Sequence, residues 1–198
     1  MLFPSEKITI ELPKASLEYF PNFFELQKAN ELFSLLQNTI PWQQDTITVF
    51  GKNHLQPRLT ALYGNKNNLY QYSNVVMKPH PWNSLLTFIK EAIEDELHNT
   101  FNAVLLNYYR NGADSMGWHA DNEASLGRNP IIASVSFGAT RPIQFKHNTL
   151  ENLKHKINLE HGSLLVMKGE TQHFWKHQIP KTSKPVGPRI NLTFRNLL

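Results

Sequence analysis

The sequence predicts an α+β fold in which two helices precede a β-rich core within one domain. The chain has 198 residues, which is long enough for one hydrophobic core and short for two. Hydrophobic residues make up 40% and charged residues 18%, a composition typical of folded proteins. Helical periodicity is confined to residues before 100, whereas short β-rich runs fill the rest of the chain.

The chain begins with a predicted strand and a predicted helix. "KITIELP" alternates between apolar and polar residues and indicates a strand that ends at Pro13. The stretch 21–41 predicts a helix that Asn22 would cap, with Glu25 three residues on, and that Pro41 would end.

A second strand and a second helix follow. "DTITVFGKNH" predicts a strand that runs into a turn at Gly51. Leu85, Ile89, Ile93 and Leu97 recur at four-residue steps and place an apolar stripe on one face of a helix. We expect both helices to pack against the core and to take no part in chemistry.

From Phe101 onward the sequence consists of short β-rich runs separated by Gly, Pro and Asn. These runs are "FNAVLLNYY", "IIASVSFG", "RPIQFKH", "HKINLE", "GSLLVMK" and "RINLTFR". Many short strands in one block are typical of a sandwich or a barrel. No linker interrupts them, so the sequence predicts a barrel-like core.

Composition narrows the possible chemistry. The chain has no cysteine, so disulfides, thiolate metal sites and cysteine nucleophiles are excluded. Residues 1–100 hold 8 Lys and Arg against 10 Asp and Glu, whereas residues 101–198 hold 12 against 6. The basic second half favours a polyanionic partner. Because no apolar run approaches ~18 residues and the first residues do not resemble a secretory signal, we expect no membrane partner and a cytoplasmic location.

"GWHADNE" places His119 and Asp121 two residues apart, so a strand would present both side chains on one face. An imidazole and a carboxylate supply two ligands of a metal site, although such pairs also occur by chance at solvated strand ends. The third ligand would come from a later histidine, and "TQHFWKHQIP" offers His173 and His177. Two histidines and one carboxylate are the ligands of non-haem Fe(II) oxygenases.

"PRINLTFRNLL" places Arg189, Asn191, Thr193 and Arg195 on one face of a strand. Buried arginines need an anion, and the planar guanidinium matches a carboxylate with two parallel hydrogen bonds. A dicarboxylate would use both arginines. The alternative is a terminal edge strand with a solvated polar face, which leaves the upstream histidines unexplained.

Four motifs in order resemble the AlkB family of Fe(II)/2-oxoglutarate dioxygenases, nearest the branch of the human nuclear DNA-repair members. They are "NYYRNGADSMGWHADNE", "PIIASVSFGATRPIQFKH", "HGSLLVMKGETQHFWKHQIP" and "PRINLTFR". The resemblance covers roughly residues 45–198. It implies a double-stranded β-helix core (jelly-roll or cupin-like) with the N-terminal helices packed on one sheet. Residues 1–100 would carry the helices and a nucleotide-recognition lid and hairpin, and residues 101–198 the dioxygenase core.

The resemblance also implies a ligand set. His119, Asp121 and His177 match the iron ligands, and His173 would be a neighbour that does not bind the metal. Arg189 matches the arginine that pairs with the distal carboxylate of 2-oxoglutarate, helped by Asn191 and Tyr109. Arg195, with Asn107, matches the support for the carboxylate nearer the metal, and Thr193 shares their face. Fe(II), 2-oxoglutarate and O₂ are the expected cofactors and co-substrates.

The implied reaction is DNA repair, in which 1-methyladenine and 3-methylcytosine lose their methyl groups with release of formaldehyde, succinate and CO₂. In "NLYQYSN" Tyr72 would stack on a flipped base and Tyr70 is a second candidate, whereas in "TVFGKN" a hairpin would probe the duplex through Val49, Phe50, Gly51 and Lys52. Asn122 and Glu123 resemble base-recognition positions, and Arg110, Arg128, Lys146 and Lys168 are candidate backbone contacts.

Two alternatives remain at this point. The same core could act on RNA or on a protein, or the chain could be an inactive nucleic-acid-binding module. The expected partner is alkylated DNA, single- or double-stranded, with RNA as the alternative. We expect a monomer, located in the nucleus if the source is eukaryotic.

Overall fold

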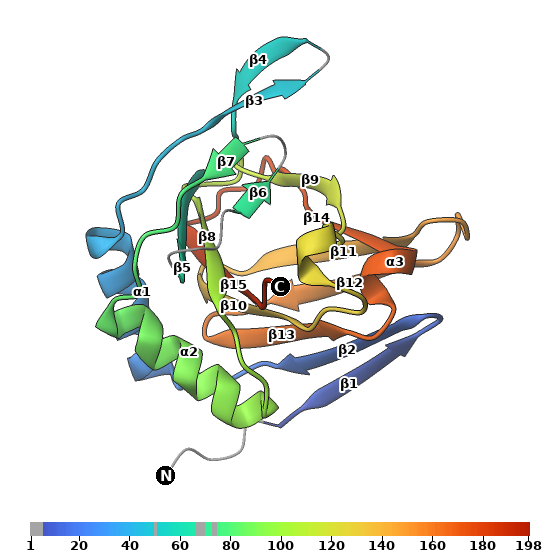
Figure 1. The fold of residues 1–198 in the computed structure, drawn as a ribbon, viewed down its shortest axis with the longest axis horizontal. Helices are drawn as coiled ribbons and strands as arrows, with labels where there is room; N and C mark the ends of the chain where they lie inside the picture. Colours follow the sequence, from blue (N-terminus) through green and yellow to red (C-terminus); the bar gives the residue numbers. More distant parts are fainter. Residues whose placement is uncertain (1–5, 50, 66–69, 73–74) are drawn as a thin grey trace.

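Two antiparallel sheets form the centre of the protein, and two helices cover the outer face of the larger sheet (Figure 1). The structure is a computed structural model that describes residues 6–49, 51–65, 70–72 and 75–198. Among these residues, no helix is both long and apolar enough to cross a membrane.

The larger sheet has seven strands in the order β1-β2-β13-β10-β15-β8-β5. Their bounds are β1 Ile8–Leu12, β2 Ala15–Phe20, β5 Leu59–Gly64, β8 Ala103–Tyr109, β10 Ile132–Gly138, β13 Ser163–Lys168 and β15 Arg189–Arg195. The sheet therefore combines strands from both sides of residue 100.

The smaller sheet has four strands in the order β12-β11-β14-β9. Their bounds are β9 Met116–His119, β11 Arg141–His147, β12 Lys154–Leu159 and β14 Trp175–Ile179. Apolar side chains of both sheets, among them Leu105, Phe145 and Trp175, pack together in one buried cluster. The two sheets thus face each other, as the predicted jelly-roll core requires.

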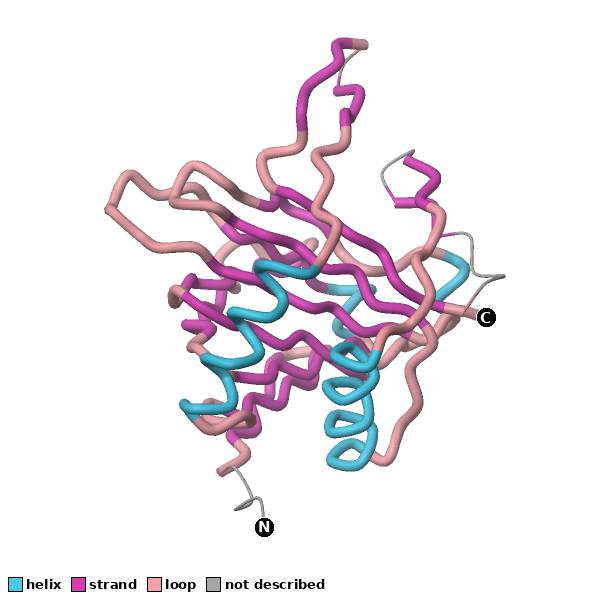
Figure 2. The backbone as a smooth tube through the Cα atoms, turned by 90° about the vertical axis from the view of Figure 1, so that its left-hand side faces the viewer, coloured by secondary structure: helices cyan, strands magenta, loops and turns pink. Residues whose placement is uncertain are grey.

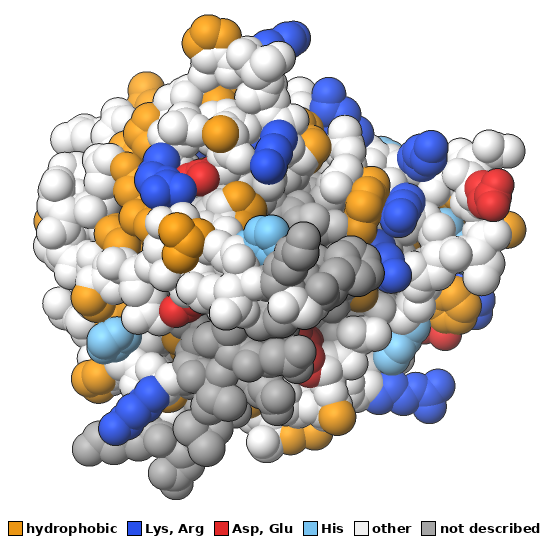
Figure 3. All heavy atoms as spheres, turned by 90° about the horizontal axis from the view of Figure 1, so that it is seen from above, with side chains coloured by type: hydrophobic (Ala, Val, Ile, Leu, Met, Phe, Trp, Pro, Cys, Tyr) orange, Lys and Arg blue, Asp and Glu red, His pale blue; other side chains and the backbone are white. Residues whose placement is uncertain are grey.

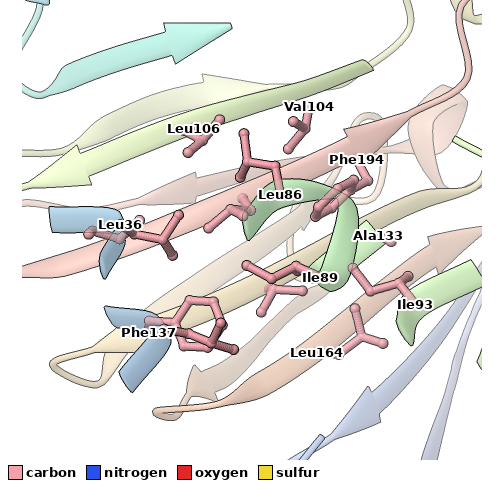
Figure 4. Close-up of a cluster of buried hydrophobic side chains, with 14 of the residues drawn as sticks. Leu36, Leu86, Ile89, Ile93, Val104, Leu106, Ala133, Phe137, Leu164 and Phe194 are labelled. Carbon is pink, nitrogen blue, oxygen red and sulfur yellow. The ribbon is translucent and has the colours of Figure 1, made fainter. Parts of the chain in front are cut away.

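The helices α1 (Leu26–Thr39) and α2 (Ser84–Leu97) pack on the opposite face of the larger sheet. Figure 4 shows Ile89 and Ile93 of α2 pointing toward strand side chains such as Phe194. In β15, Ile190, Leu192 and Phe194 join this helix-covered cluster, which leaves the alternate residues to face the other sheet.

Two hairpins and two short helices complete the fold. The hairpin of β3 (Thr46–Val49) and β4 (Lys52–Leu55) projects away from the sheets, as Figure 2 shows. β6 (Tyr70–Tyr72) and β7 (Val75–Met77) form the second hairpin. The short helices are α3 (Thr171–Phe174) and a 3₁₀ turn at Ala124–Leu126.

The structure corrects two predictions near the N-terminus. The first helix begins at Leu26, so Asn22 does not cap it, and the residue before the helix, Glu25, makes no side-chain cap. The backbone N–H of Phe24 instead donates to the carbonyl of Gly162 at 2.9 Å, which ties this segment to a distant turn. Residues 15–20, which were not predicted to be regular, form β2. The predicted turn at Gly51 is confirmed, with φ +74°.

Candidate metal and dicarboxylate site

The predicted triad comes together between the two sheets. His119 on β9 and His177 on β14 are direct cross-strand partners, and Asp121 follows β9 by two residues. One ligand atom from each of the three residues lies within 4.8 Å of the others. His173 lies on α3 and is exposed, so the structure distinguishes between the two candidate histidines.

Hydrogen bonds orient these side chains. Nδ1 of His119 lies 2.8 Å from the carbonyl oxygen of Gly117, which can only accept, so Nδ1 carries the proton and Nε2 keeps its lone pair. The backbone N–H of Asp121 donates to Oε1 of Gln172 at 2.9 Å. Nη2 of Arg195 donates to Oδ1 of Asp121 at 2.8 Å, which leaves Oδ2 as a candidate metal ligand.

The electrostatics of the triad favour metal binding. Burial, the largest single effect, would raise the pKa of Asp121, but the charge of Arg195, its hydrogen bond and the two neighbouring histidines together lower the pKa to about 2. Burial lowers the pKa of His177 to about 3, and it also lowers the pKa of His119. At neutral pH the site therefore offers one carboxylate and two neutral imidazoles, the protonation states that a divalent metal requires.

The polar face of β15 meets that of β8. The antiparallel register places Arg189 opposite Tyr109 and Asn191 opposite Asn107, all on the side that faces the smaller sheet. Together with Thr193, Arg195 and the triad, these residues line one shared cavity. The prediction that Arg189, Asn191, Thr193 and Arg195 share one face of a strand is thus confirmed.

Arg189 is buried and only partly paired, as expected for a residue that binds an anion. Arg189 is 1% exposed, and its Nη2 donates to Oγ of Ser136 at 2.9 Å. Nε and Nη1 are buried and have no acceptor within the part of the chain that the structure describes. Burial lowers the pKa of Arg189 to about 10, so the guanidinium stays charged at neutral pH. A buried cation with unpaired N–H groups fits a carboxylate.

Three residues that support the site were not predicted from the sequence. Nε of Arg58 donates to Oδ1 of Asn107 at 2.7 Å. The guanidinium of Arg141, 1% exposed, donates to the carbonyl oxygens of Asn111, Asp114 and Pro180 and lies beside the ring of Tyr109. Gln172 is the third. Each acts through contacts over 27 or more sequence positions, so no local pattern indicated it.

Ser134 and Ser136 also support the site, and the sequence contained a pattern from which they could have been predicted. They alternate with Ala133, Val135 and Phe137 in "IIASVSFG", so their hydroxyls share the inner face of a strand. Oγ of Ser134 accepts from Nδ2 of Asn191 at 2.8 Å, and Oγ of Ser136 accepts from Arg189. Two small polar residues at alternate positions of a buried strand were the available signal.

Of the predicted substrate contacts, Asn122 and Glu123 do not line the cavity, and few of the others have described side chains. Asn122 is exposed and Glu123 is half-buried at the start of the 3₁₀ turn. Tyr70 and Tyr72 lie on β6 and Lys52 begins β4, with only their backbones described, and Phe50 lies outside the described residues. Val49 ends β3, and Gly51 is exposed at the tip of that hairpin.

The four candidate backbone cations differ in their surroundings. Arg110 pairs with Asp114 at 2.8 Å, and Lys168 pairs with Glu18 at 2.7 Å. Arg128 is exposed. The ammonium of Lys146 lies over the ring of Trp118. Lys168 is therefore engaged in an ion pair with a neighbouring strand, whereas Lys146 lies on β11, which pairs with β14.

Comparisons with known proteins agree with this geometry. The profile of the 2OG-Fe(II) oxygenase superfamily matches residues 16–195. Human alpha-ketoglutarate-dependent dioxygenase alkB homolog 3 is 42% identical over 189 residues, which cover 90% of this chain and 65% of that protein. Human DNA oxidative demethylase ALKBH2 is 36% identical over 88% of this chain and 71% of its own length. The chain thus spans slightly less than two thirds of alkB homolog 3.

Solved structures support the fold. The structure of OsALKBH1 superposes with a TM-score of 0.66 at 16% identity, covering 96% of this chain and all of that one. A 2OG-Fe(II) oxygenase-family oxidoreductase from Burkholderia pseudomallei gives a TM-score of 0.58 at 11% identity, over 90% of this chain and 84% of its own. At these identities the likeness concerns the arrangement of strands and helices, which matches the predicted jelly-roll core.

Proposed function

Because the chain belongs to the 2OG-Fe(II) oxygenase superfamily and, within it, to the AlkB homologues, we propose that it is a DNA repair dioxygenase. Its reaction would demethylate N-alkylated bases, 1-methyladenine and 3-methylcytosine, with release of formaldehyde, succinate and CO₂. The observation that carries the proposal is one cavity lined by both the His119–Asp121–His177 triad and Arg189, a residue with unpaired buried N–H groups. Relatives with a similar sequence are named as DNA oxidative demethylases.

The residues of the site fit the groups that the proposal requires. His119, Asp121 and His177 would hold Fe(II), and Arg189, with Tyr109, Asn191 and Thr193, would hold the distal carboxylate of 2-oxoglutarate. Arg195 and Asn107 would support the nearer carboxylate. When bound, iron with 2-oxoglutarate and O₂ supplies the oxidising chemistry that attacks an N-methyl carbon.

The protein itself positions and encloses the reactants. Gly117 keeps the proton on Nδ1 of His119, so Nε2 faces the metal position. Arg195 keeps Asp121 ionised, and burial keeps His177 neutral. The apolar side chains of Leu105, Ile143 and Ile179 line the same cavity and limit access of water.

The substrate would reach the site as an extruded or single-stranded base, because a methyl group on a Watson–Crick nitrogen is buried in a duplex. Tyr72 and Tyr70 on β6 would stack on this base, and Asn122 and Glu123 would contact its edge. The projecting β3–β4 hairpin would probe the duplex, and Val49, Phe50, Gly51 and Lys52 are the residues proposed for this contact. The projection of the hairpin in Figure 1 supports this role.

Formaldehyde release from methylated oligonucleotides tests the proposal. We expect release that requires Fe(II) and 2-oxoglutarate and that disappears in His119→Ala, Asp121→Ala and His177→Ala. A His173→Ala variant is the matched control, because His173 is exposed on α3. Normal turnover in the His177→Ala variant would contradict the ligand assignment.

Competing substrates separate the remaining alternatives. Methylated DNA, methylated RNA and methylated peptide are offered together, and the formaldehyde yield from each is measured. Preferred turnover of RNA or of peptide would overturn DNA as the substrate. No turnover of any of them by the iron-loaded protein would favour an inactive binding module.

A further inference from the structure

The outer face of the four-stranded sheet carries a row of lysines. The register pairs Lys146 on β11 with Lys154 on β12 and with Lys176 on β14. The exposed residues of the three strands point the same way, because their neighbours Phe145, Ile157 and His177 are buried. Like charges directly opposite each other across strands destabilise a sheet. The row therefore costs stability unless an anion binds to it.

Among the described residues, no carboxylate pairs with these lysines. Within the described residues, Lys146, Lys154, Lys156 and Lys176 form no ion pair. The lysines on the other side of the molecule differ, since Lys7 pairs with Glu18, Lys14 with Glu170 and Lys28 with Glu31. The lysines of the outer sheet face are thus available to an external polyanion.

An exposed tryptophan adjoins these lysines. Trp118 on β9 is 37% exposed, and the ammonium of Lys146 lies 4.6 Å from the centre of its ring. Trp118 lines a surface depression together with Gln144, Lys154 and Lys156. Figure 3 shows Lys and Arg side chains gathered along one side of the upper face of the molecule. Cations beside an open aromatic face are the combination by which proteins hold single-stranded nucleic acid.

We propose that this surface, formed by Lys146, Lys154, Lys156, Lys176 and Trp118, binds single-stranded DNA that flanks the target base. The lysines would contact consecutive phosphates, and Trp118 would stack on a neighbouring base. The inference rests on the proposed function, since it supplies the path by which the strand leaves the site. Trp118 directly precedes His119 on β9, the edge strand of the four-stranded sheet, so the surface lies across this edge from the metal site.

Salt dependence of DNA binding tests the lysines. The test variant carries Lys154→Gln, Lys156→Gln and Lys176→Gln, and keeps Lys146 because of its contact with Trp118. Each phosphate contact on a single strand makes the slope of log K against log salt steeper by about 0.7. The slope of the variant, which lacks three contacts, should therefore be shallower than that of the wild type by about 2. Fluorescence anisotropy measures this slope with unmodified DNA of about 15 nucleotides, a length close to known binding sites.

The matched control carries Lys7→Gln, Lys14→Gln and Lys28→Gln, which changes the net charge equally on the β1, β2 and α1 side. Its slope should stay near that of the wild type. An equal slope in the two triple variants would overturn the proposal. Thermal unfolding checks the fold, and the test variant should melt no lower than the wild type because it relieves repulsion between lysines.

Stacking is tested separately at Trp118. We expect Trp118→Ala to bind the same DNA about tenfold more weakly and Trp118→Phe to retain most of the affinity. Equal affinity in Trp118→Ala and the wild type would remove the stacking role.

The outcomes separate this inference from the proposed function, because the binding assay needs no turnover. A reduced slope without formaldehyde release from any substrate would support the surface and contradict the activity. Turnover together with unchanged slopes would support the activity and contradict the proposed surface. Self-association of the wild type that is lost in the lysine variant would assign the face to a second copy of the chain and overturn the inference.

Discussion

Arg189 is a buried cation that the protein leaves partly unpaired, and this determines what the residue can bind. Its Nη2 has Ser136 as a partner, whereas Nε and Nη1 have no acceptor among the described residues. A lysine would place a single ammonium there and could not make two parallel bonds to a carboxylate. The identity of the residue, beyond its charge, is therefore expected to determine the affinity for 2-oxoglutarate.

We predict that Arg189→Lys raises the dissociation constant for 2-oxoglutarate about 10- to 100-fold, since bonds to charged groups contribute about 1.5–3 kcal/mol. Anaerobic titration of the Fe(II) protein, followed through its weak visible absorption band, measures the constant. Arg128→Lys, at an exposed position, is the control. An unchanged constant in Arg189→Lys would remove this residue from the dicarboxylate site.

Asp114 gives the protein a pH-dependent contribution to stability. Burial disfavours its carboxylate, but hydrogen bonds from the side chain and the backbone of Arg110 outweigh burial, and the pKa of Asp114 lies below its ordinary value of 3.8. A carboxyl whose pKa is lower in the folded state stabilises that state above its ordinary pKa. The contribution is lost as the pH falls through the pKa of the folded state.

We therefore predict that Asp114→Asn lowers the free energy of unfolding at neutral pH, by roughly 1–3 kcal/mol for an unpaired buried group. The difference from the wild type should stay constant down to about pH 4 and shrink below it. Urea unfolding at a series of pH values measures both. A difference that persists unchanged at pH 3 would contradict the contribution of the ionised carboxylate.

At the scale of elements, α2 is held to the larger sheet by a few side chains. Ile89 is fully buried, whereas Phe88 on the same helix is 45% exposed. We predict that Ile89→Ala lowers the free energy of unfolding by about 2–5 kcal/mol, because it leaves a cavity in the cluster of Figure 4. Phe88→Ala is the matched control and should cost much less. Chemical denaturation compares the two.

Strands and helices were predictable where a local pattern decided them. The apolar stripe of α2 and the alternation of "RINLTFR" both gave the correct face, since one face of each is buried. The start of α1 was not predictable, because the bond from Phe24 to Gly162 spans the chain. The side-chain cap predicted at Asn22 for the first helix is absent. It is α2 that has such a cap, since the side chain of Asn83 accepts from the backbone N–H of Leu86 at 2.9 Å.

In the site, too, residues in local motifs were predictable and residues held by long-range contacts were not. His119, Asp121, His177 and Arg189 lie in the motifs that resemble the AlkB family, so the resemblance allowed their meeting to be predicted. Arg58 and Arg141 belong to no such motif, and their roles depend on carbonyl and amide oxygens from other segments. A sequence indicates which side chains share a strand face, but the partners of a buried arginine are known only once the sheets are packed.

At the scale of the whole molecule, the site joins the two sheets. The metal candidates lie on β9, on β14 and in the loop after β9, whereas Arg189 belongs to β15 of the larger sheet. A metal alone would tie together parts of the smaller sheet. A dicarboxylate that contacts both the metal position and Arg189 would connect the sheets, so the two ligands are expected to stabilise the fold cooperatively.

Thermal unfolding measures this coupling, with Mn(II) as a metal that resists oxidation in air. A ligand at 100 times its dissociation constant adds about 2.7 kcal/mol, which is about 5–10 °C for a chain of this size. We predict that Mn(II) and 2-oxoglutarate together raise the melting temperature by more than the sum of their separate shifts. In Arg189→Lys the rise in melting temperature with Mn(II) alone should remain. The additional rise beyond the sum of the two separate shifts should become smaller, because only the contact with the larger sheet is weakened. Strictly additive shifts in the wild type would mean that the two ligands bind independently.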